Sequence, residues 1–307
     1  MSESGNKWEI IVLGGGPAGL TAALYGSRAG HSVLVLEPAM YGGQIATTDW
    51  LENFPGIPEG ITGPEYSEKV EQQARKFGAE LMNASLEEVE LTGAEKKIVT
   101  SEGEFKASKV IIASGTEPRK LGVEGEDLLQ GRGISYCATC DAAFFRDKEV
   151  AVVGGGDSAV EEALFLTRFA RAVYLIHRRD RLRAVQNLQD KLLTHPQVKV
   201  FWNTVVQEVQ GDKKVEGLTL MQKDGSRDLP VNGVFVSIGR EPNTVFLGNQ
   251  VELNDNKFII TDEEMRTSTP GVFAAGDVRE KLLRQVVTAA SDGAIAAYVA
   301  SRELQEL

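Results

Sequence analysis

The two cysteines of the chain stand three positions apart, in the segment Cys137-Ala138-Thr139-Cys140. Two thiols at this spacing can close a small disulfide ring, open it and close it again, because so short a loop closes with little loss of chain entropy. Two cysteines in 307 residues do not make the disulfide framework of a secreted domain. In a reducing cytoplasm, where we expect this protein, a C-x-x-C pair is more typical of catalysis or of metal binding.

Asp141 follows the second cysteine directly. A carboxyl group there can carry the proton that a thiol must lose or gain, provided that burial raises its pKa toward neutrality. Aspartate is also a favoured residue at the start of a helix, so Asp141 could cap a segment that begins near Ala142. The sequence leaves both roles open, and they are compatible.

Two glycine-rich turns lie on either side of the cysteines. In the first, a strand at 9–13 leads into Gly14-x-Gly16-x-x-Gly19, a helix at 20–29 and a strand at 32–36. In the second, a strand at 149–153 leads into Gly154-x-Gly156-x-x-Ala159, a helix at 160–169 and a strand at 172–176. Each copy has the order of a dinucleotide-binding βαβ unit, in which the glycines admit a pyrophosphate to the start of the helix.

The residues that end the second strand of each copy predict different nucleotides. The same offset from the first glycine is occupied by Glu37 in one copy and by His177, followed by Arg178 and Arg179, in the other. A carboxylate at this position accepts hydrogen bonds from a ribose diol, whereas arginines suit a 2′-phosphate. We therefore expect an unphosphorylated adenosine, as in FAD or NAD, at the first turn and NADPH at the second. A solvated basic surface is the alternative for the arginine run.

The fold class predicted is α/β, with two Rossmann-like domains, one inserted into the other. About 60 residues follow the second unit, which is near the lower limit for an independent domain. We expect this tail to complete the first domain, so that 1–116 and 245–307 form the FAD-binding domain and 117–244 form the inserted NADPH-binding domain. Strands at 110–115 and 234–239 mark the crossings, with linkers near 116–121 and 240–244.

Composition and charge exclude several classes of protein. The chain is 42% hydrophobic and 25% charged, as in an ordinary globular protein, and no apolar stretch approaches the roughly 20 residues of a membrane helix. A net charge of −11 argues against a nucleic-acid partner. The three histidines, His31, His177 and His195, do not have the spacing of metal ligands with one another or with the cysteines, so no metal site is expected.

The motifs, in this order, resemble those of the low-molecular-weight, bacterial-type thioredoxin reductases. They run over nearly the whole chain and include Gly14-Gly15-Gly16-Pro17-Ala18-Gly19, Gly42-Gly43-Gln44, Glu52-Asn53-Phe54-Pro55-Gly56, Cys137-Ala138-Thr139-Cys140-Asp141, Gly154-Gly155-Gly156-Asp157-Ser158-Ala159, His177-Arg178-Arg179 and Gly276-Asp277. The resemblance implies a homodimeric flavoprotein that passes electrons from NADPH through FAD and the Cys137–Cys140 disulfide to thioredoxin. The family also implies that one domain rotates about the linkers between the half-reactions.

The resemblance also assigns site residues. Cys137, Cys140 and Asp141 are the expected catalytic residues, with Cys140 nearer the flavin by family analogy. The expected FAD contacts are Gly14, Gly16, Pro17, Ala18, Gly19, Glu37, Gly42, Gly43, Gln44, Asn53, Gly115, Asp277, Arg284, Gln285 and Val286. The expected NADPH contacts are Gly154, Gly156, Asp157, Ser158, His177, Arg178, Arg179, Arg183 and Arg240. Thioredoxin would dock near Arg132, Phe144 and Phe145.

The chain departs from the family at Ala142, where a glycine commonly follows the aspartate, and at Ala143, where some members carry an aromatic residue. These departures bear on the partner-docking surface and not on the chemistry. Ala142 could simply reflect a backbone that needs no positive φ.

Several alternatives keep the same fold. The physiological partner could be another thioredoxin-like protein or a peroxiredoxin system, or the chain could be a dithiol oxidase or be fed by ferredoxin; the arginines after the second turn argue against the last two. A more distant alternative is a nucleotide-binding protein whose two cysteines form half of a zinc site. Two cysteines supply only half of a tetrahedral shell.

Overall fold

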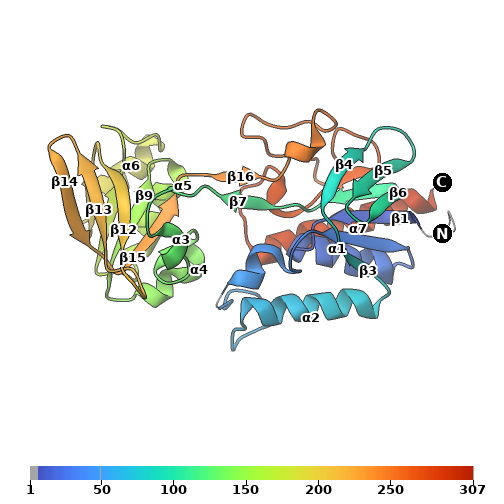
Figure 1. The fold of residues 1–307 in the computed structure, drawn as a ribbon, viewed down its shortest axis with the longest axis horizontal. Helices are drawn as coiled ribbons and strands as arrows, with labels where there is room; N and C mark the ends of the chain where they lie inside the picture. Colours follow the sequence, from blue (N-terminus) through green and yellow to red (C-terminus); the bar gives the residue numbers. More distant parts are fainter. Residues whose placement is uncertain (1–5, 49, 307) are drawn as a thin grey trace. The chain divides into compact units, whose positions relative to one another are not determined.

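The computed structural model describes residues 6–48 and 50–306. The chain folds as two compact units (Figure 1). One is made of the chain up to Glu117 together with the chain from Glu241 onward, and the other is Pro118–Arg240. The second unit is therefore inserted into the first.

The larger unit is built on a seven-stranded sheet in which β3, β2, β1, β6, β5 and β4 are neighbours in that order and β17 also pairs with β6. The strands β3, β2, β1, β6 and β17 are parallel, while β5 and β4 add an antiparallel extension. The strand bounds are β1 Lys7–Leu13, β2 Val33–Glu37, β3 Glu80–Asn83, β4 Leu86–Glu90, β5 Lys96–Thr100, β6 Gly103–Ile112 and β17 Val272–Ala274.

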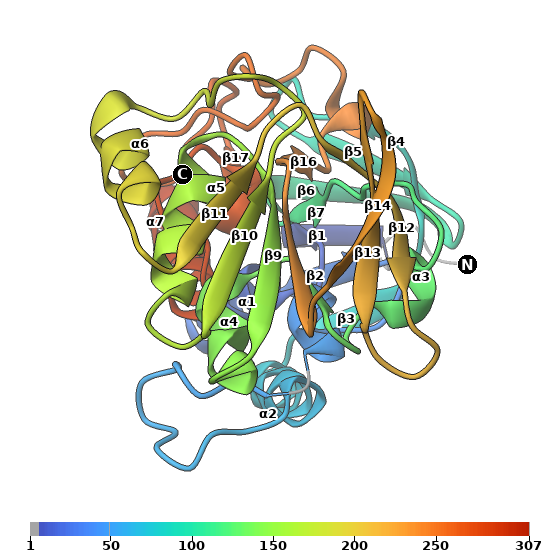
Figure 2. The ribbon, with the colours of Figure 1, turned by 90° about the vertical axis from the view of Figure 1, so that its left-hand side faces the viewer.

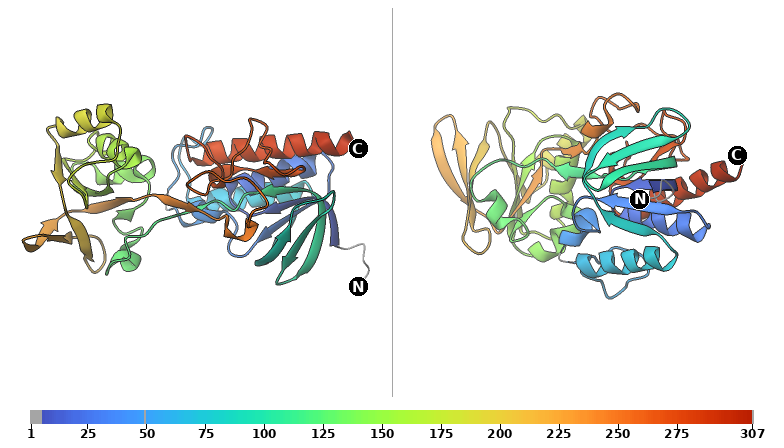
Figure 3. Two further views of the ribbon diagram at one scale, coloured as in Figure 1. Left: turned by 90° about the horizontal axis from the view of Figure 1, so that it is seen from above. Right: turned by 45° about the vertical axis from the view of Figure 1, so that its right-hand side comes forward.

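The strands of this sheet bury side chains on both faces, as expected for a parallel sheet with covered faces. Ile10 and Val12 of β1 pack with alanines of α1 and α7, whereas Ile11 and Leu13 pack toward β4, β5 and the segment around Leu247. Figure 3 shows α7 running beside α1. The helices and 3-10 turns are α1 Pro17–Arg28, Gly43–Thr47, α2 Gly63–Lys76, Val245–Leu247, Gly276–Val278 and α7 Val286–Gln305.

Small residues allow α1 and α7 to approach closely. A Cβ added at Gly293 of α7 would lie 2.1 Å from the backbone oxygen of Ala18, and one at Gly276 would lie 2.8 Å from the Ala18 Cβ. The start of α1, which carries the first glycine turn, is therefore held against α7 by backbone contact.

The smaller unit contains a five-stranded parallel sheet in the order β11, β10, β9, β15, β8. Figure 2 shows β11, β10 and β9 side by side. Val150 and Val152 of β9 face helix α5, and Ala151 and Val153 face an antiparallel sheet of β12, β13 and β14. The elements are α3 Glu126–Leu129, β8 Ile134–Ser135, α4 Ala138–Asp141, the 3-10 turn Ala142–Phe145, β9 Glu149–Gly154, α5 Asp157–Leu166, β10 Ala172–Ile176, α6 Gln186–Leu193, β11 Val198–Phe201, β12 Val205–Gln210, β13 Gly217–Gln222, β14 Gly225–Pro230 and β15 Gly233–Ser237.

The two segments that connect the units pair with each other as β7 (Thr116–Pro118) and β16 (Arg240–Pro242). Each is preceded by a glycine with positive φ, Gly115 at 68° and Gly239 at 113°. Each therefore reads Gly-x-Glu-Pro: a residue that favours the left-handed region comes first, and a proline that fixes φ comes last.

The strands and helices predicted around the two glycine turns are present. Both helices begin three residues earlier than predicted, at Pro17 and Asp157, because the glycine turn itself ends in the first helical turn. The antiparallel strands β4, β5 and β12–β14 were not among the elements predicted from the sequence. Within the described residues no helix is long and apolar enough to cross a membrane.

Candidate active site

The first glycine turn contains glycines of two kinds. Gly14 has a φ of 109°, and a Cβ there would lie 2.4 Å from the Ala113 oxygen; a Cβ on Gly19 would lie 1.9 Å from the Gly14 oxygen. These two positions are required by the fold of the turn. Gly16 differs, because its φ of −75° suits any residue and its Cβ would meet only the Gly42 oxygen, at 4.0 Å.

Gly16 precedes a helix start that carries no side-chain cap and no acidic residue in its first turn. Pro17 occupies the first helical position, where a missing N–H costs nothing, and the N–H groups of Ala18 and Gly19 follow it. An uncapped helix start with open space beside a glycine fits a phosphate.

A second glycine pair lies against the first turn. The Gly42 N–H donates to the Gly15 oxygen at 2.8 Å, and a Cβ on Gly43 would lie 3.3 Å from the Gly16 Cα. Both have positive φ, 107° and 56°. The Gln44 amide donates to the Thr116 carbonyl oxygen, next to Gly115. These predicted FAD residues therefore gather around Gly16.

Glu37 ends β2 beside the same turn. Its carboxylate accepts hydrogen bonds from the Gly15 N–H at 2.7 Å and the Ala39 N–H at 3.0 Å. A carboxylate can accept about four hydrogen bonds, so capacity remains for a ribose diol.

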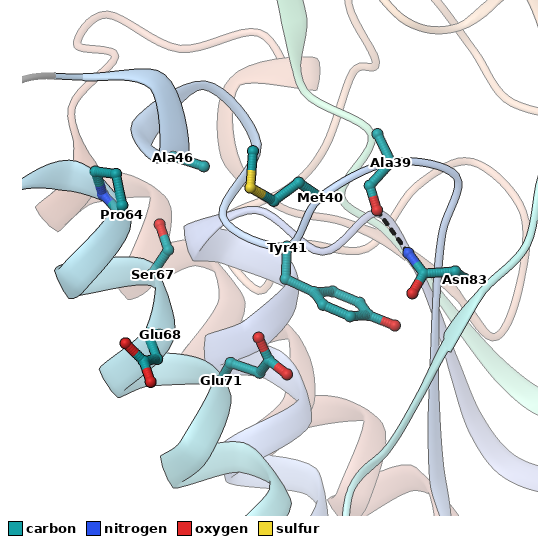
Figure 4. Close-up of a pocket in the computed structure, with 9 residues that line it drawn as sticks. All are labelled: Ala39, Met40, Tyr41, Ala46, Pro64, Ser67, Glu68, Glu71 and Asn83. Atoms are coloured by element: carbon teal, nitrogen blue, oxygen red, sulfur yellow. Dashed lines mark hydrogen bonds between the residues drawn. The ribbon is translucent and has the colours of Figure 1, made fainter.

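A pocket of about 310 Å³ opens between the chain after β2 and helix α2 (Figure 4). The Asn83 amide at the end of β3 closes one side by donating to the Ala39 oxygen at 2.5 Å. The Tyr41 ring lies within the lining, and burial raises the pKa of its hydroxyl. The residues that line the pocket are Ala39, Met40, Tyr41, Ala46, Pro64, Ser67, Glu68, Glu71 and Asn83. No sequence motif marks these residues, so they were not predicted.

The remaining predicted FAD residues lie near the start of α7. The Asn53 amide donates to Gln285 Oε1 at 3.0 Å, and Gln285 caps α7 by a reciprocal pair of hydrogen bonds with Thr288. Val286 is the first residue of α7. The Arg284 guanidinium stacks 4.3 Å from the centre of the Phe258 ring, and its Nε lies 3.5 Å from the backbone oxygen of Asp277.

The glycine turn of the smaller unit also contains one glycine that the fold requires, Gly154, and one that it does not, Gly156. A Cβ on Gly154 would lie 2.3 Å from the Ser237 oxygen and 2.5 Å from the Ala159 Cβ. Gly156 has a φ of −92°, and a Cβ there would meet nothing within 4 Å. Glycine at 156 is not needed by the protein itself, which fits a ligand that approaches the backbone closely.

The segment after β10 wraps around this turn. The Arg183 N–H donates to the Gly155 oxygen at 2.7 Å, and Asp157 Oδ1 accepts from the Val185 N–H at 2.8 Å. Arg178, Arg179 and Arg183 are exposed, and they form no ion pair among the residues that the structure describes. Three uncompensated guanidinium groups beside a helix start suit a 2′-phosphate. Ser158 is exposed in the first turn of that helix.

His177 lies apart from the arginines with which the sequence grouped it. Its side chain is 5% exposed, and its ring nitrogens lie 2.8 Å from the Gly154 oxygen and 2.9 Å from the Arg181 oxygen. A Cβ on Gly155 would lie 2.2 Å from the ring. The buried His177 ring therefore packs against the backbone of the turn and contacts the Gly154 carbonyl oxygen, instead of presenting the ring to a ligand.

A buried acid lies behind the same turn. Burial raises the pKa of Glu162, on α5, to about 7, although a hydrogen bond with Ser237 and the charge of Arg240 act in the opposite direction. Its Oε2 is buried with no hydrogen-bond partner in the described structure. Arg240, a predicted NADPH residue, thus has a carboxyl group near it.

Cys137 and Cys140 form a disulfide, with Cα atoms 5.3 Å apart. Cys137 has an extended backbone and precedes α4, whose single turn contains Cys140 and Asp141; the N–H groups of both donate to the Cys137 oxygen at 3.2 Å. Ala142 has helical φ and ψ of −55° and −34°, so its backbone does not need glycine.

Asp141 occupies the position before the 3-10 turn Ala142–Phe145, but its side chain makes no cap hydrogen bond there, so of the two roles left open by the sequence the capping role is not observed. Instead Asp141 Oδ2 accepts a hydrogen bond of 2.6 Å from the hydroxyl of Ser135, which also accepts from the Cys137 N–H at 3.0 Å. Ser135 was not among the predicted site residues, because a serine before a cysteine pair carries no signal of its own.

The predicted docking residues are not all at the surface. Arg132 is exposed and Phe144 is 51% exposed, but Phe145 is 8% exposed and packs edge-on against Phe235 with ring centres 5.2 Å apart. Phe145 is therefore a core residue of the smaller unit, and the prediction that it contributes to a docking surface is wrong.

Comparisons with known proteins identify the family. Residues 8–293 match the model of the pyridine nucleotide-disulphide oxidoreductases. The chain belongs to this family. It is 49% identical to a thioredoxin reductase of Listeria monocytogenes, covering 100% of this chain and 97% of that one, and 47% identical to one of Bacillus subtilis, covering 98% and 96%. A crystal structure of thioredoxin reductase from Streptococcus pyogenes superposes with a TM-score of 0.92 at 43% identity, covering 98% and 99%.

The family uses FAD and NADPH, and the residues present fit both groups. Gly16 and Gly156 each leave open space beside a helix start without a side-chain cap. A carboxylate follows the first turn and three exposed arginines follow the second. The resemblance to the thioredoxin reductases, first suggested by the motifs, is confirmed.

Proposed function

We propose that the chain is an NADPH-dependent thioredoxin reductase, which passes two electrons from NADPH to the Cys137–Cys140 disulfide and from there to thioredoxin. The observation that carries the proposal is the disulfide itself. It lies in the unit that also holds the arginine-flanked glycine turn, and an aspartate follows it directly.

The two units hold different cofactors in this proposal. The unit with Gly16, Gly43 and Glu37 binds FAD, which when bound relays electrons from NADPH to the disulfide. The pocket in Figure 4, which is lined by residues that follow β2 and by Asn83 at the end of β3, suits the adenosine half of FAD. The unit with Gly156, Arg178 and Arg179 binds NADPH.

The cysteines exchange with thioredoxin by thiolate attack. A thiolate of the reduced pair attacks the thioredoxin disulfide to form a mixed disulfide, and the second thiolate then releases reduced thioredoxin and re-forms the Cys137–Cys140 bond. Asp141 exchanges a proton with the pair in each direction. Arg132 and Phe144 lie at the surface of this unit and are available for docking.

Anaerobic titration with NADPH, followed by oxidised thioredoxin, tests the proposal. We expect NADPH to bleach the flavin absorbance and thioredoxin to restore it. The Cys140→Ser variant should still be bleached by NADPH but fail to reduce thioredoxin. Normal turnover by that variant would refute the electron path, and a colourless protein loaded with zinc would favour the zinc half-site.

Two arginines provide a matched test of the nucleotide. We expect Arg178→Gln to raise the KM for NADPH by about 10- to 100-fold, since a charge-assisted hydrogen bond contributes about 1.5–3 kcal/mol. The KM for NADH, which lacks the 2′-phosphate, should change little. Arg181→Gln is the control, because Arg181 is also exposed but was not assigned to the phosphate. Equal effects of the two substitutions would contradict the assignment.

We also propose that the protein is a homodimer, formed through α7. Val287 and Tyr298 are 39% and 61% exposed on this helix, and their spacing of 11 residues places them on one face. Tyr298→Asp should shift the mass in analytical ultracentrifugation from dimer to monomer. Leu128→Asp, at a similarly exposed leucine of α3, should leave the mass unchanged.

A cytoplasmic location agrees with this function, because the pair must be reduced in each cycle. The partner could also be another thioredoxin-like protein or a peroxiredoxin system. The exposed arginines disfavour the dithiol oxidase and the ferredoxin-fed reductase, which do not need a 2′-phosphate site. Comparing thioredoxin with these acceptors under identical NADPH concentrations separates the alternatives.

A further inference from the structure

Ser135 lies at the centre of the hydrogen bonds of the cysteine segment. It ends β8 and is 5% exposed. Its Oγ lies 2.6 Å from Asp141 Oδ2, 3.0 Å from the Cys137 nitrogen and 3.3 Å from the Cys137 oxygen. One hydroxyl thus contacts the aspartate that follows one cysteine and both backbone polar groups of the other cysteine.

The Ser135 hydroxyl has a single hydrogen, and this limits which of these contacts can be hydrogen bonds at the same time. A serine hydroxyl has one hydrogen to donate and two lone pairs that can accept. The Cys137 N–H must donate, so it takes one lone pair. The single hydroxyl hydrogen then goes to the nearer and charged partner, Asp141 Oδ2, in preference to the Cys137 oxygen.

The same contacts can serve a protonated Asp141. Its carboxyl O–H then donates to the second lone pair of Ser135 Oγ, and the hydroxyl hydrogen turns to the Cys137 oxygen at 3.3 Å. Each of these polar groups keeps a hydrogen-bond partner whether Asp141 is ionised or protonated. Apart from the proton gained by Asp141, only the hydroxyl hydrogen of Ser135 changes its direction. We propose that Ser135 is a positioning residue that holds the Asp141 carboxyl group in place while it gains and loses a proton.

This inference rests on the proposed function, in which Asp141 exchanges protons with the cysteines. Reduction breaks the S–S bond, takes up two electrons supplied by NADPH, and leaves two sulfurs that accept up to two protons. Asp141 delivers one of these protons and is reprotonated from water. Oxidation by the thioredoxin disulfide reverses the transfer. The carboxyl group must therefore keep its orientation in both protonation states.

A merely structural role for Ser135 predicts something different. The bond from the Cys137 N–H to Ser135 Oγ would stabilise the turn whether or not residue 141 carries a titrating group. Removing the hydroxyl would then impair the enzyme equally with aspartate or asparagine at position 141. A double-mutant cycle separates the two roles.

The test measures kcat for thioredoxin reduction against pH in the full-length enzyme and in Ser135→Ala, Asp141→Asn and the double variant. We expect Ser135→Ala to lower kcat about tenfold, the effect of losing one hydrogen bond to a charged group. In the Asp141→Asn background the same substitution should change kcat less than twofold. The limb of the pH profile that disappears in Asp141→Asn should move to higher pH in Ser135→Ala, since the lost bond favours the ionised form.

Ser135→Thr keeps the hydroxyl and should retain most of the rate. Ser301→Ala removes another buried serine hydroxyl, which donates to the Ala297 oxygen at 2.8 Å in α7, and should leave the pH profile unmoved. Equal losses from Ser135→Ala in both backgrounds, or a wild-type rate in Asp141→Asn, would overturn the inference. Failure of the wild-type enzyme to reduce thioredoxin would instead refute the proposed function.

Discussion

At the scale of single residues, Glu162 gives the protein a specific dependence of stability on pH. Burial raises its pKa from 4.5 to about 7 in the folded state. Below pH 4.5 the group is protonated in both states and has no effect. As the pH rises toward 7 the unfolded chain loses this proton first, so it binds fewer protons than the folded chain and stability falls. Above pH 7 the loss levels off at about 3 kcal/mol.

Glu162→Gln should remove this dependence. Between pH 5 and pH 8 we expect the free energy of unfolding of the wild type to fall relative to that of the variant, by up to about 3 kcal/mol. Chemical denaturation at both pH values measures the difference. Glu161→Gln, at the exposed neighbour, is the control. Parallel stability curves for the wild type and Glu162→Gln would show that the folded protein does not hold this proton.

At the scale of elements, each glycine turn separates the requirements of the fold from those of the ligand. Gly154 is closed in by the Ser237 oxygen, while Gly156 faces open space with an ordinary φ. A sequence motif cannot make this distinction, because both positions are glycine. The distances from an added Cβ to its neighbours do distinguish the two positions.

Gly156→Ala and Gly154→Ala should therefore fail in different ways. Gly156→Ala should keep its melting temperature and flavin content but raise the KM for NADPH at least tenfold, because the methyl group occupies the space beside the helix start. Gly154→Ala should lower stability by more than about 2 kcal/mol, since its methyl group would meet backbone oxygen and the Ala159 side chain. Thermal unfolding and NADPH kinetics measure the two effects. A destabilised Gly156→Ala variant would contradict this division.

The sequence predicted the elements that follow a strong local pattern. The strands and helices around both turns, and the strand that leads to Gly276, are present because apolar runs next to glycine turns have few other solutions. The burial of Phe145 could not be read from the chain, since it depends on the absence of a side chain at Gly233, far along the sequence. The bond from Ser135 to Asp141 likewise depends on how β8 and α4 meet in space.

At the scale of the whole molecule, the insertion of one unit into the other determines how the parts can be separated. The smaller unit has its own sheet and apolar cores on both faces of it. Its first and last residues, Pro118 and Arg240, belong to the paired strands β7 and β16. Both properties are those of a domain that can fold alone.

A fragment of residues 118–240 should fold without the rest of the chain. We expect a cooperative thermal transition by circular dichroism and binding of NADPH without flavin, detected by calorimetry. The same fragment with Arg178→Gln is the control for binding. A fragment that remains unfolded would show that the cores of this unit need the larger one.

The paired connections also limit how the two units can move. A body held by one strand can swing in any direction, whereas two strands that are hydrogen-bonded to each other resist bending within the plane of the pair and leave torsion along it as an easier movement. Gly115 and Gly239, both in the left-handed region, stand at the start of these strands, and a proline ends each one. If the units reorient during the catalytic cycle, the pair behaves as a torsion spring, whose stiffness one added methyl group at Gly239 would change.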